Sequence, residues 1–153
     1  MTSKITIRDF QPGDMERLLD FREETGRISF PGLRMDRERT RRILLRHAER
    51  YPGTIKVALS GNRPVGFIRF QPKSGEFGKY GHIDIIFVEQ AFRRKGVGVL
   101  LLREAEKWFK KKGVRRIYAE ITGTNSPSLK FFKGRGYKGM RTVVEKDFGK
   151  KAD

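Results

Sequence analysis

A short basic segment with two glycines carries the clearest chemistry in this chain. Residues 93–98 read Arg93, Arg94, Lys95, Gly96, Val97 and Gly98. They follow an apolar run, residues 83–88, and precede a helix with an apolar stripe, predicted over residues 99–112. Backbone N–H groups at a helix start have no partner within the helix, and the helix dipole favours negative charge there. Because three cations flank these amides and glycine allows close approach, the segment, called the basic turn below, suits a diphosphate.

Strands and helices must place this turn in space. Alternating and apolar runs predict strands over residues 4–8, 54–59, 65–70, 81–88, 114–121 and 137–146. Helices are predicted to start near Asp14, Asp36, residue 99 and residue 127. Residues 27–35 and 72–79, which contain glycine and proline, are predicted as connections. The predicted order is β-α-α-β-β-β-α-β-α-β, in one domain over residues 1–153.

Composition excludes several classes of site. The chain of 153 residues has no cysteine, which removes disulfides, zinc–thiolate sites and cysteine nucleophiles. With only two histidines, His47 and His82, a histidine-rich metal site is also excluded. No apolar run approaches the roughly 18 residues that span a membrane, so no membrane partner is expected and a cytoplasmic location follows by default.

The net charge of +17 points to an anionic partner. One interpretation is that the partner is a nucleic acid, and the sequence leaves this alternative open. The other is a solvated basic surface together with a site for a phosphorylated cofactor, and the absence of a DNA- or RNA-binding motif favours this interpretation slightly.

Three segments at matching spacing resemble one known family. The first is Arg93-x-x-Gly96-x-Gly98 after a strand, similar to that family's acetyl-CoA pyrophosphate signature. The second resembles its Asn-x-x-Ala-x-x-Phe-Tyr-x-x-x-Gly-Phe segment and reads Asn125, Ser128, Phe131, Phe132, Gly136 and Tyr137. The third resembles its first strand and helix start, with Ile7, Arg8 and Asp14. Over essentially its full length the chain resembles the GNAT (GCN5-related) N-acetyltransferases.

The resemblance implies an α/β (α+β) fold. Its central sheet would be mixed, mostly antiparallel and twisted, with about six strands, flanking helices and a splay between strands 81–88 and 114–121. The pantetheine arm of acetyl-CoA would enter the splay and pair with the strand edge near residues 86–88. The residues implied to bind acetyl-CoA are Phe87, Val88, Arg93, Arg94, Lys95, Gly96, Val97, Gly98, Val99, Asn125, Ser128 and Phe132. Dimers are common in that family, so the resemblance also implies a homodimer as one of the assembly states to test.

Acetyl transfer to an amine needs an oxyanion donor, for which the Val88 N–H is the candidate, and a route for protons. Deprotonating a lysine amine, with a pKa of about 10.4, costs roughly 4–5 kcal/mol at neutral pH. Deprotonating an α-amino group, with a pKa of about 7.7–8.0, costs only about 1 kcal/mol at the same pH. A weak or distant base therefore suits an N-terminal amine better than a lysine.

His82 and Asp84 are the candidate bases, because residues two apart on a strand share a face. The family often has a carboxylate where this chain has His82. As alternatives, His82 could be an exposed residue at a strand end and Asp84 part of a structural salt bridge. Glu120 is a third candidate base.

The general acid departs from the family pattern. Phe132 stands where the family often has tyrosine, and phenylalanine cannot protonate a thiolate. Either Tyr137 or Tyr118 serves instead, or CoA leaves as the thiolate, which a thiol pKa of about 8.5 permits. Phe132 would then be a packing wall for pantetheine. Asn125 and Ser128 could equally be ordinary cap residues of a short helix.

The sequence therefore predicts an acetyl-CoA-dependent N-acetyltransferase that acts on a primary amine of a protein or small molecule. Phe30 and Leu33 could line the acceptor pocket, or they could equally anchor the loop over residues 27–35. The alternatives are a catalytically idle protein that binds acyl-CoA and a basic nucleic-acid-binding module. A nucleoside triphosphate enzyme is disfavoured because no Gly-Lys-Ser/Thr follows the basic turn.

Overall fold

The computed structural model describes residues 4–121 and 125–149. They belong to two compact units, Met1–Thr122 and Gly123–Asp153. The first unit contains β1 (Ile5–Asp9), α1 (Met15–Ser29), α2 (Arg37–Arg50), β2 (Ile55–Ser60), β3 (Arg63–Gly75), β4 (Gly78–Val88), α3 (Val97–Lys111) and β5 (Ile117–Ala119). Short 3₁₀ turns precede α1 and α3, at Pro12–Asp14 and Gln90–Phe92. The second unit contains α4 (Ser126–Gly134).

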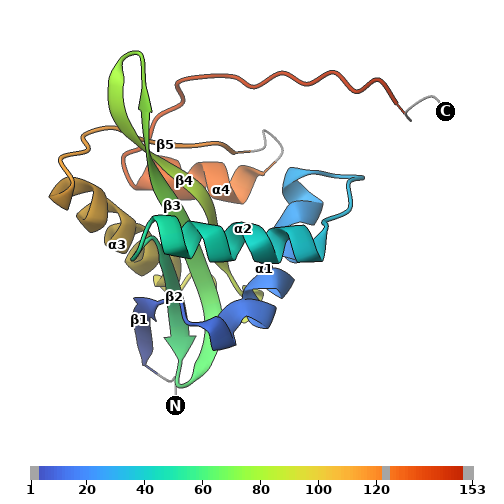
Figure 1. The fold of residues 1–153 in the computed structure, drawn as a ribbon, viewed down its shortest axis with the longest axis vertical. Helices are drawn as coiled ribbons and strands as arrows, with labels where there is room; N and C mark the ends of the chain where they lie inside the picture. The colour runs from blue at the N-terminus through green and yellow to red at the C-terminus, as the bar shows by residue number, and fades with distance from the viewer. Residues whose placement is uncertain (1–3, 122–124, 150–153) are drawn as a thin grey trace. The chain divides into compact units, whose positions relative to one another are not determined.

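One mixed sheet organises the first unit (Figure 1). Its five strands lie in chain order, with antiparallel pairs from β1 to β4 and a parallel pair between β4 and β5. The buried residues of α1 and α2 pack with β2 and β4 in one hydrophobic cluster. On the other face, Phe109 of α3 contacts the sheet through Phe70 of β3, with ring centroids 5.3 Å apart. The predicted class of fold is confirmed, with five strands in the described parts of the chain.

Local sequence explains where the helices start and which side they bury. The Asp36 carboxylate accepts a hydrogen bond from the Arg39 N–H at 2.9 Å, which caps α2 as predicted. Helix α3 buries one stripe, with four-residue spacing, made by Val97, Leu101, Leu102, Ala105 and Phe109. Because this stripe begins at Val97, the first residue of α3, packing fixes the helix start within the basic turn.

Strand β4 contains a bulge at Asp84. Arg69 of β3 pairs with Ile85, and the next residue, Phe70, pairs with Ile83, so Asp84 has no partner in the ladder. A bulge adds a residue to one strand and changes which face the following side chains take.

The faces of β4 change accordingly along the strand. Gly81 lies against the Phe109 ring of α3, where an added Cβ would come within 2.9 Å of three ring carbons. Phe87 instead stacks on Phe21 of α1, with centroids 4.7 Å apart. In a regular strand, residues 81 and 87 would share a face. The bulge thus places Ile85 and Phe87, which follow Asp84, on the face that packs against α1 and α2.

Several predicted boundaries were wrong, and α1 extends to Ser29, inside the predicted connection over residues 27–35. Residues 72–79 are not a loose connection, because Pro72 pairs with Gly81 and the β3–β4 hairpin continues to the Gly75–Gly78 pair. The outer hairpin is mostly polar, so its sequence lacks the apolar signal of a buried strand. Strand β5 covers only Ile117–Ala119 of the predicted 114–121.

The predicted last strand, residues 137–146, is also absent as a strand. This segment alternates apolar and polar residues, yet its Met140, Val143 and Val144 side chains are exposed. A local pattern gives strand propensity, whereas a strand exists only where a neighbour completes the hydrogen-bond ladder. No helix of the described residues combines the length and the apolar character that a membrane crossing requires.

Candidate active site

The basic turn follows β4, and its last two residues, Val97 and Gly98, are the first residues of α3. Gly96 is the cap residue of α3 and has φ of 83°, a backbone conformation that favours glycine. No atom of the described residues accepts a hydrogen bond from the N–H groups of Val97, Gly98 or Val99. These amides form the positive end of a helix of 15 residues, with Arg93, Arg94 and Lys95 exposed beside them. The geometry therefore matches an anion site.

The last residues of β4 have an open edge beside this turn. Strand β5 pairs with β4 only from Gly81 to Ile83, which leaves residues 84–88 without a β5 partner among the described residues. The Glu89 N–H donates to the Val65 carbonyl of β3 at 2.8 Å. Because successive amides of a strand point to opposite edges, the Val88 N–H points to the open edge. The Val88 carbonyl accepts from Arg93 Nε at 2.7 Å, so the basic turn reaches this edge.

His82 and Asp84 are brought together as a hydrogen-bonded pair. His82 Nδ1 lies 2.6 Å from Asp84 Oδ1, and the side chains are 17% and 7% exposed. His82 lies inside β4, so the alternative of an exposed residue at a strand end is wrong. With Nδ1 donating to the carboxylate, Nε2 carries the lone pair that can accept a proton.

Asp84 is the centre of a wider polar cluster. Besides His82, its carboxylate accepts hydrogen bonds from Arg69 Nε at 3.2 Å and Gln71 Nε2 at 2.8 Å. Burial alone would raise the pKa of Asp84, but the His82 hydrogen bond, the Arg69 charge and the Gln71 hydrogen bond together lower it. Asp84 is therefore an ionised carboxylate, and its salt bridge with Arg69 exists alongside the contact with His82.

His47 approaches the same cluster from α2, on the face of the sheet that this helix covers. Its Nε2 donates to the Phe70 carbonyl at 2.8 Å, and its Nδ1 lies 3.9 Å from Asp84 Oδ2. Only 8% of the residue is exposed, so His47 is one of the buried polar residues of the first unit. Burial lowers the pKa of His47. His47 therefore acts as a neutral structural donor that fixes α2 on β3.

The predicted residues of the second unit have local roles. The Asn125 side chain accepts from the Ser128 N–H at 3.4 Å and caps α4. Phe132 is buried, and its ring centroid lies 5.2 Å from that of Tyr137. The Tyr137 N–H donates to the Phe132 carbonyl, beyond the end of α4. The alternative of an ordinary helix cap thus describes Asn125 well, and the ligand contacts of these residues stay predictions.

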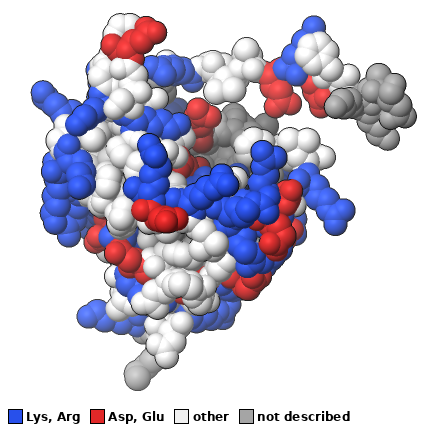
Figure 2. Space-filling model, viewed as in Figure 1, with Lys and Arg blue, Asp and Glu red and all other residues white. Residues whose placement is uncertain are grey.

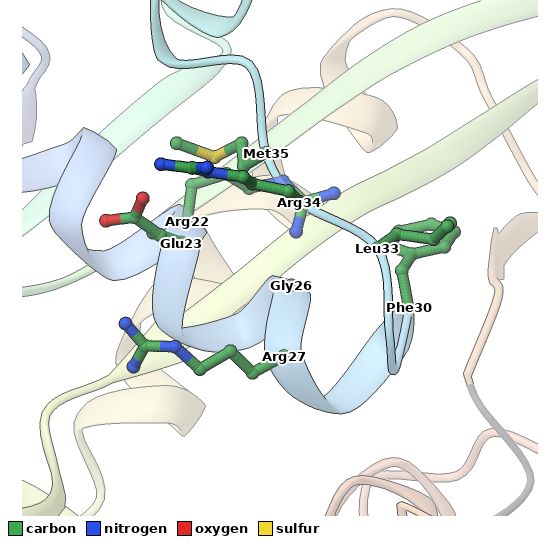
Figure 3. Close-up of a pocket in the computed structure, with 8 residues that line it drawn as sticks. All are labelled: Arg22, Glu23, Gly26, Arg27, Phe30, Leu33, Arg34 and Met35. Atoms are coloured by element: carbon green, nitrogen blue, oxygen red, sulfur yellow. The ribbon is translucent and has the colours of Figure 1, made fainter.

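A hollow of about 460 Å³ lies at the end of α1 and in the loop that follows (Figure 3). It is called the arginine pocket and is lined by Arg22, Glu23, Gly26, Arg27, Phe30, Leu33, Arg34 and Met35. Phe30 and Leu33 were expected in a pocket wall, and both line this one. A second hollow, of about 510 Å³, lies near the start of β4 and is lined by Lys79, Gly113, Arg115 and Arg116.

Sequence reasoning missed Arg69, Gln71 and the arginines of the pocket. Arg69 and Gln71 flank the buried Phe70 on β3, an alternation that signals a polar face. Their contact with Asp84 depends on the register and the bulge, which local sequence does not specify.

Comparisons with known proteins agree with this geometry. A model of the Acetyltransferase (GNAT) family matches residues 15–137. "Putative phosphinothricin acetyltransferase YwnH" of Bacillus subtilis is 34% identical over 93 residues, which cover 60% of this chain and 56% of that protein. An "N-alpha-acetyltransferase" of Sulfurisphaera tokodaii is 27% identical over 110 residues, which cover 66% of each chain. The chain thus spans only part of the length of these relatives.

A solved structure shows the same fold. The aminoglycoside N-acetyltransferase AAC(6')-Iy in complex with CoA superposes with a TM-score of 0.79 at 18% identity, covering 97% of both chains. At this level of identity the match concerns the fold alone.

Proposed function

Since the chain belongs to the GNAT acetyltransferase family, we propose that it is an acetyl-CoA-dependent N-acetyltransferase whose acceptor is a primary amine. One observation carries the proposal. The start of α3 offers three backbone N–H groups that have no acceptor among the described residues, together with three flanking cations, next to the open edge of β4. A diphosphate with a peptide-like arm fits both features, and CoA has this chemistry.

The described residues suit the donor in two places. Val97, Gly98 and Val99 would hold the diphosphate through their N–H groups, with Arg93, Arg94 and Lys95 supplying charge. Residues 86–88, including the backbone of Phe87, would pair with the pantetheine amides. Acetyl-CoA supplies an acetyl group activated as a thioester. The Val88 N–H, which points to the open edge, is the proposed donor to the oxyanion.

His82 is the proposed general base. Its Nε2 would take the proton that the amine loses, while the ionised Asp84 fixes the ring and stabilises its charged form. Asp84 is then a positioning residue, since its oxygens are occupied by His82, Arg69 and Gln71. Of the two candidate bases, His82 is therefore proposed as the base and Asp84 as its positioning partner.

Tyr137 stays the proposed donor of a proton to the leaving thiolate, with Tyr118 as the other candidate. Phe132, buried against the Tyr137 ring, has no proton to give. Asn125, Ser128 and Phe132 are proposed to contact the pantetheine side of the donor. Departure as a thiolate, protonated by water, is the alternative if Tyr137 proves dispensable.

The relatives suggest two acceptor classes. One relative is named for phosphinothricin, a small molecule, and the other for N-alpha acetylation. Acetyl transfer to phosphinothricin and to a peptide α-amine should therefore be compared directly. Turnover of either separates the enzyme from an idle protein that only binds acyl-CoA.

Calorimetric titration with acetyl-CoA tests the donor site. The double variant Arg94→Gln/Lys95→Gln should weaken binding about tenfold, because charge-assisted contacts to phosphate are lost. The control Arg39→Gln/Arg42→Gln removes the same charge from the exposed side of α2 and should leave binding nearly unchanged. Equal weakening by both variants would show that net charge alone attracts the ligand.

A further inference from the structure

The arginine pocket has an excess of positive charge that the described residues do not neutralise. Three of its eight lining residues are arginines, against one carboxylate, Glu23. Glu23 already lies 3.7 Å from Arg37, outside the pocket lining. Neither Arg27 nor Arg34 has an ion-pair partner among the described residues.

Arg22 shows the imbalance most clearly. Its guanidinium is half-buried, donates to Thr25 Oγ1 at 3.3 Å, and lies 5.8 Å from the centroid of the Phe30 ring. No carboxylate of the described residues pairs with it. Burial lowers the pKa of Arg22, and the nearby charge of Arg69 adds to this. A half-buried cation that lacks a counter-ion is partly desolvated, so an anion that joins it is stabilising.

One arginine, Arg69, interacts both with the pocket and with the partner of the proposed base. The charge of Arg69 acts on Arg22, and Arg69 Nε donates to Asp84, the partner of His82. A ligand whose anionic end meets Arg22 therefore lies on the same side of the sheet as His82. Phe30 and Leu33, 49% and 70% exposed, offer an apolar wall beside the arginines.

We infer that the arginine pocket binds a carboxylate of the acceptor, so that the preferred substrate is a small amine with a carboxylate and an apolar group. This inference rests on the proposed function. A volume of about 460 Å³ suits a small molecule rather than a folded protein surface. Arg22 is the principal anion ligand, with Arg34 and Arg27 at the exposed rim.

Glycyl-leucine and its C-terminal amide form a matched pair of probes. They share the amine and the apolar side chain and differ only in the distant carboxylate, so the reactivity of the amine is nearly the same. We expect kcat/KM of the wild type to be about tenfold higher for the acid than for the amide. Arg22→Gln should remove most of this preference, and Arg34→Gln, an exposed position, should reduce it even if Arg22→Gln folds poorly.

Arg42→Gln is the charge control, since Arg42 is exposed on α2 and outside the pocket. It should retain the preference. Equal acetylation of acid and amide by the wild type overturns the inference and leaves the proposed function standing. If neither is acetylated, the proposed function loses this support, and calorimetry with N-acetyl-glycyl-leucine and its amide decides the pocket alone. Stronger binding of the acid supports the inference, and equal or absent binding overturns it.

Discussion

Asp84 determines the chemistry of the candidate site because four polar side chains approach it. His82, Arg69 and Gln71 donate to its oxygens, and His47 lies 3.9 Å away. The spacing of His82 and Asp84 in the sequence predicted that they share a face. The other partners come from β3 and α2, so they could be found only once the strand register and the helix position were known.

Asp84→Asn should lower kcat about tenfold to a hundredfold, because the amide no longer stabilises a charged His82 ring. Asp84→Glu keeps the negative charge and should retain more of the rate than Asp84→Asn. Asp20→Asn, on the exposed side of α1, removes the same charge and serves as control. A loss of stability with an unchanged kcat would instead identify Asp84 as a purely structural ion-pair partner.

His47 should make stability depend on pH. Burial lowers the pKa of His47, so below the unfolded value of about 6.5 the unfolded chain binds a proton that the folded chain resists. Its contribution to stability is therefore complete above about pH 6.5 and declines as pH falls below that value, by at most about 1.4 kcal/mol per pH unit.

Urea unfolding at several pH values tests this linkage. In His47→Gln the amide can still donate to the Phe70 carbonyl, and the decline between roughly pH 7 and pH 5 should become shallower. Asp84, whose pKa is lowered, adds its own loss of stability only at more acidic pH, below about 3.9. An identical decline in wild type and variant would contradict the role of His47.

At the scale of elements, strand β4 combines a bulge, a close approach and an open edge. The apolar run over residues 83–88 predicted this strand, and the order of the elements before and after it was also predicted. The bulge at Asp84 was not, because no local pattern marks the extra residue. The hairpin end and residues 137–146 were misjudged for a related reason, since pairing depends on a partner strand rather than on local alternation.

Gly66 of β3 permits the close approach to β4 near Val88. A Cβ at this position would lie 2.6 Å from the Phe87 carbonyl oxygen and 3.3 Å from the Val88 Cα. Gly66→Ala should therefore destabilise the fold by about 1–3 kcal/mol in urea unfolding. It should also weaken acetyl-CoA binding, because β4 must shift at the proposed oxyanion donor.

Gly13→Ala is the matched control, because an added Cβ there meets no atom within 4 Å. This variant should have a stability within about 0.5 kcal/mol of the wild type. Similar unfolding curves for both variants would show that the β3–β4 contact tolerates a methyl group.

At the scale of the molecule, the net charge of +17 is spread widely over the surface. Figure 2 shows Lys and Arg side chains across the face on which α2 lies, where Arg39, Arg42, Arg46 and Arg50 are exposed. The composition predicted an anionic partner. The basic turn and the arginine pocket are the two sites at which we propose that anionic groups bind. A nucleic-acid partner, a homodimer and a single domain over residues 1–153 stay predictions.

Release of free CoA thiol from acetyl-CoA, followed with and without glycyl-leucine, tests the central claim most directly. The account predicts thiol release that requires the amine, saturates with acetyl-CoA and yields N-acetyl-glycyl-leucine in equal amount. Phosphinothricin and a peptide of unrelated sequence extend the test to the other acceptors. A folded protein that releases no thiol above the uncatalysed rate with any of these amines would contradict the account.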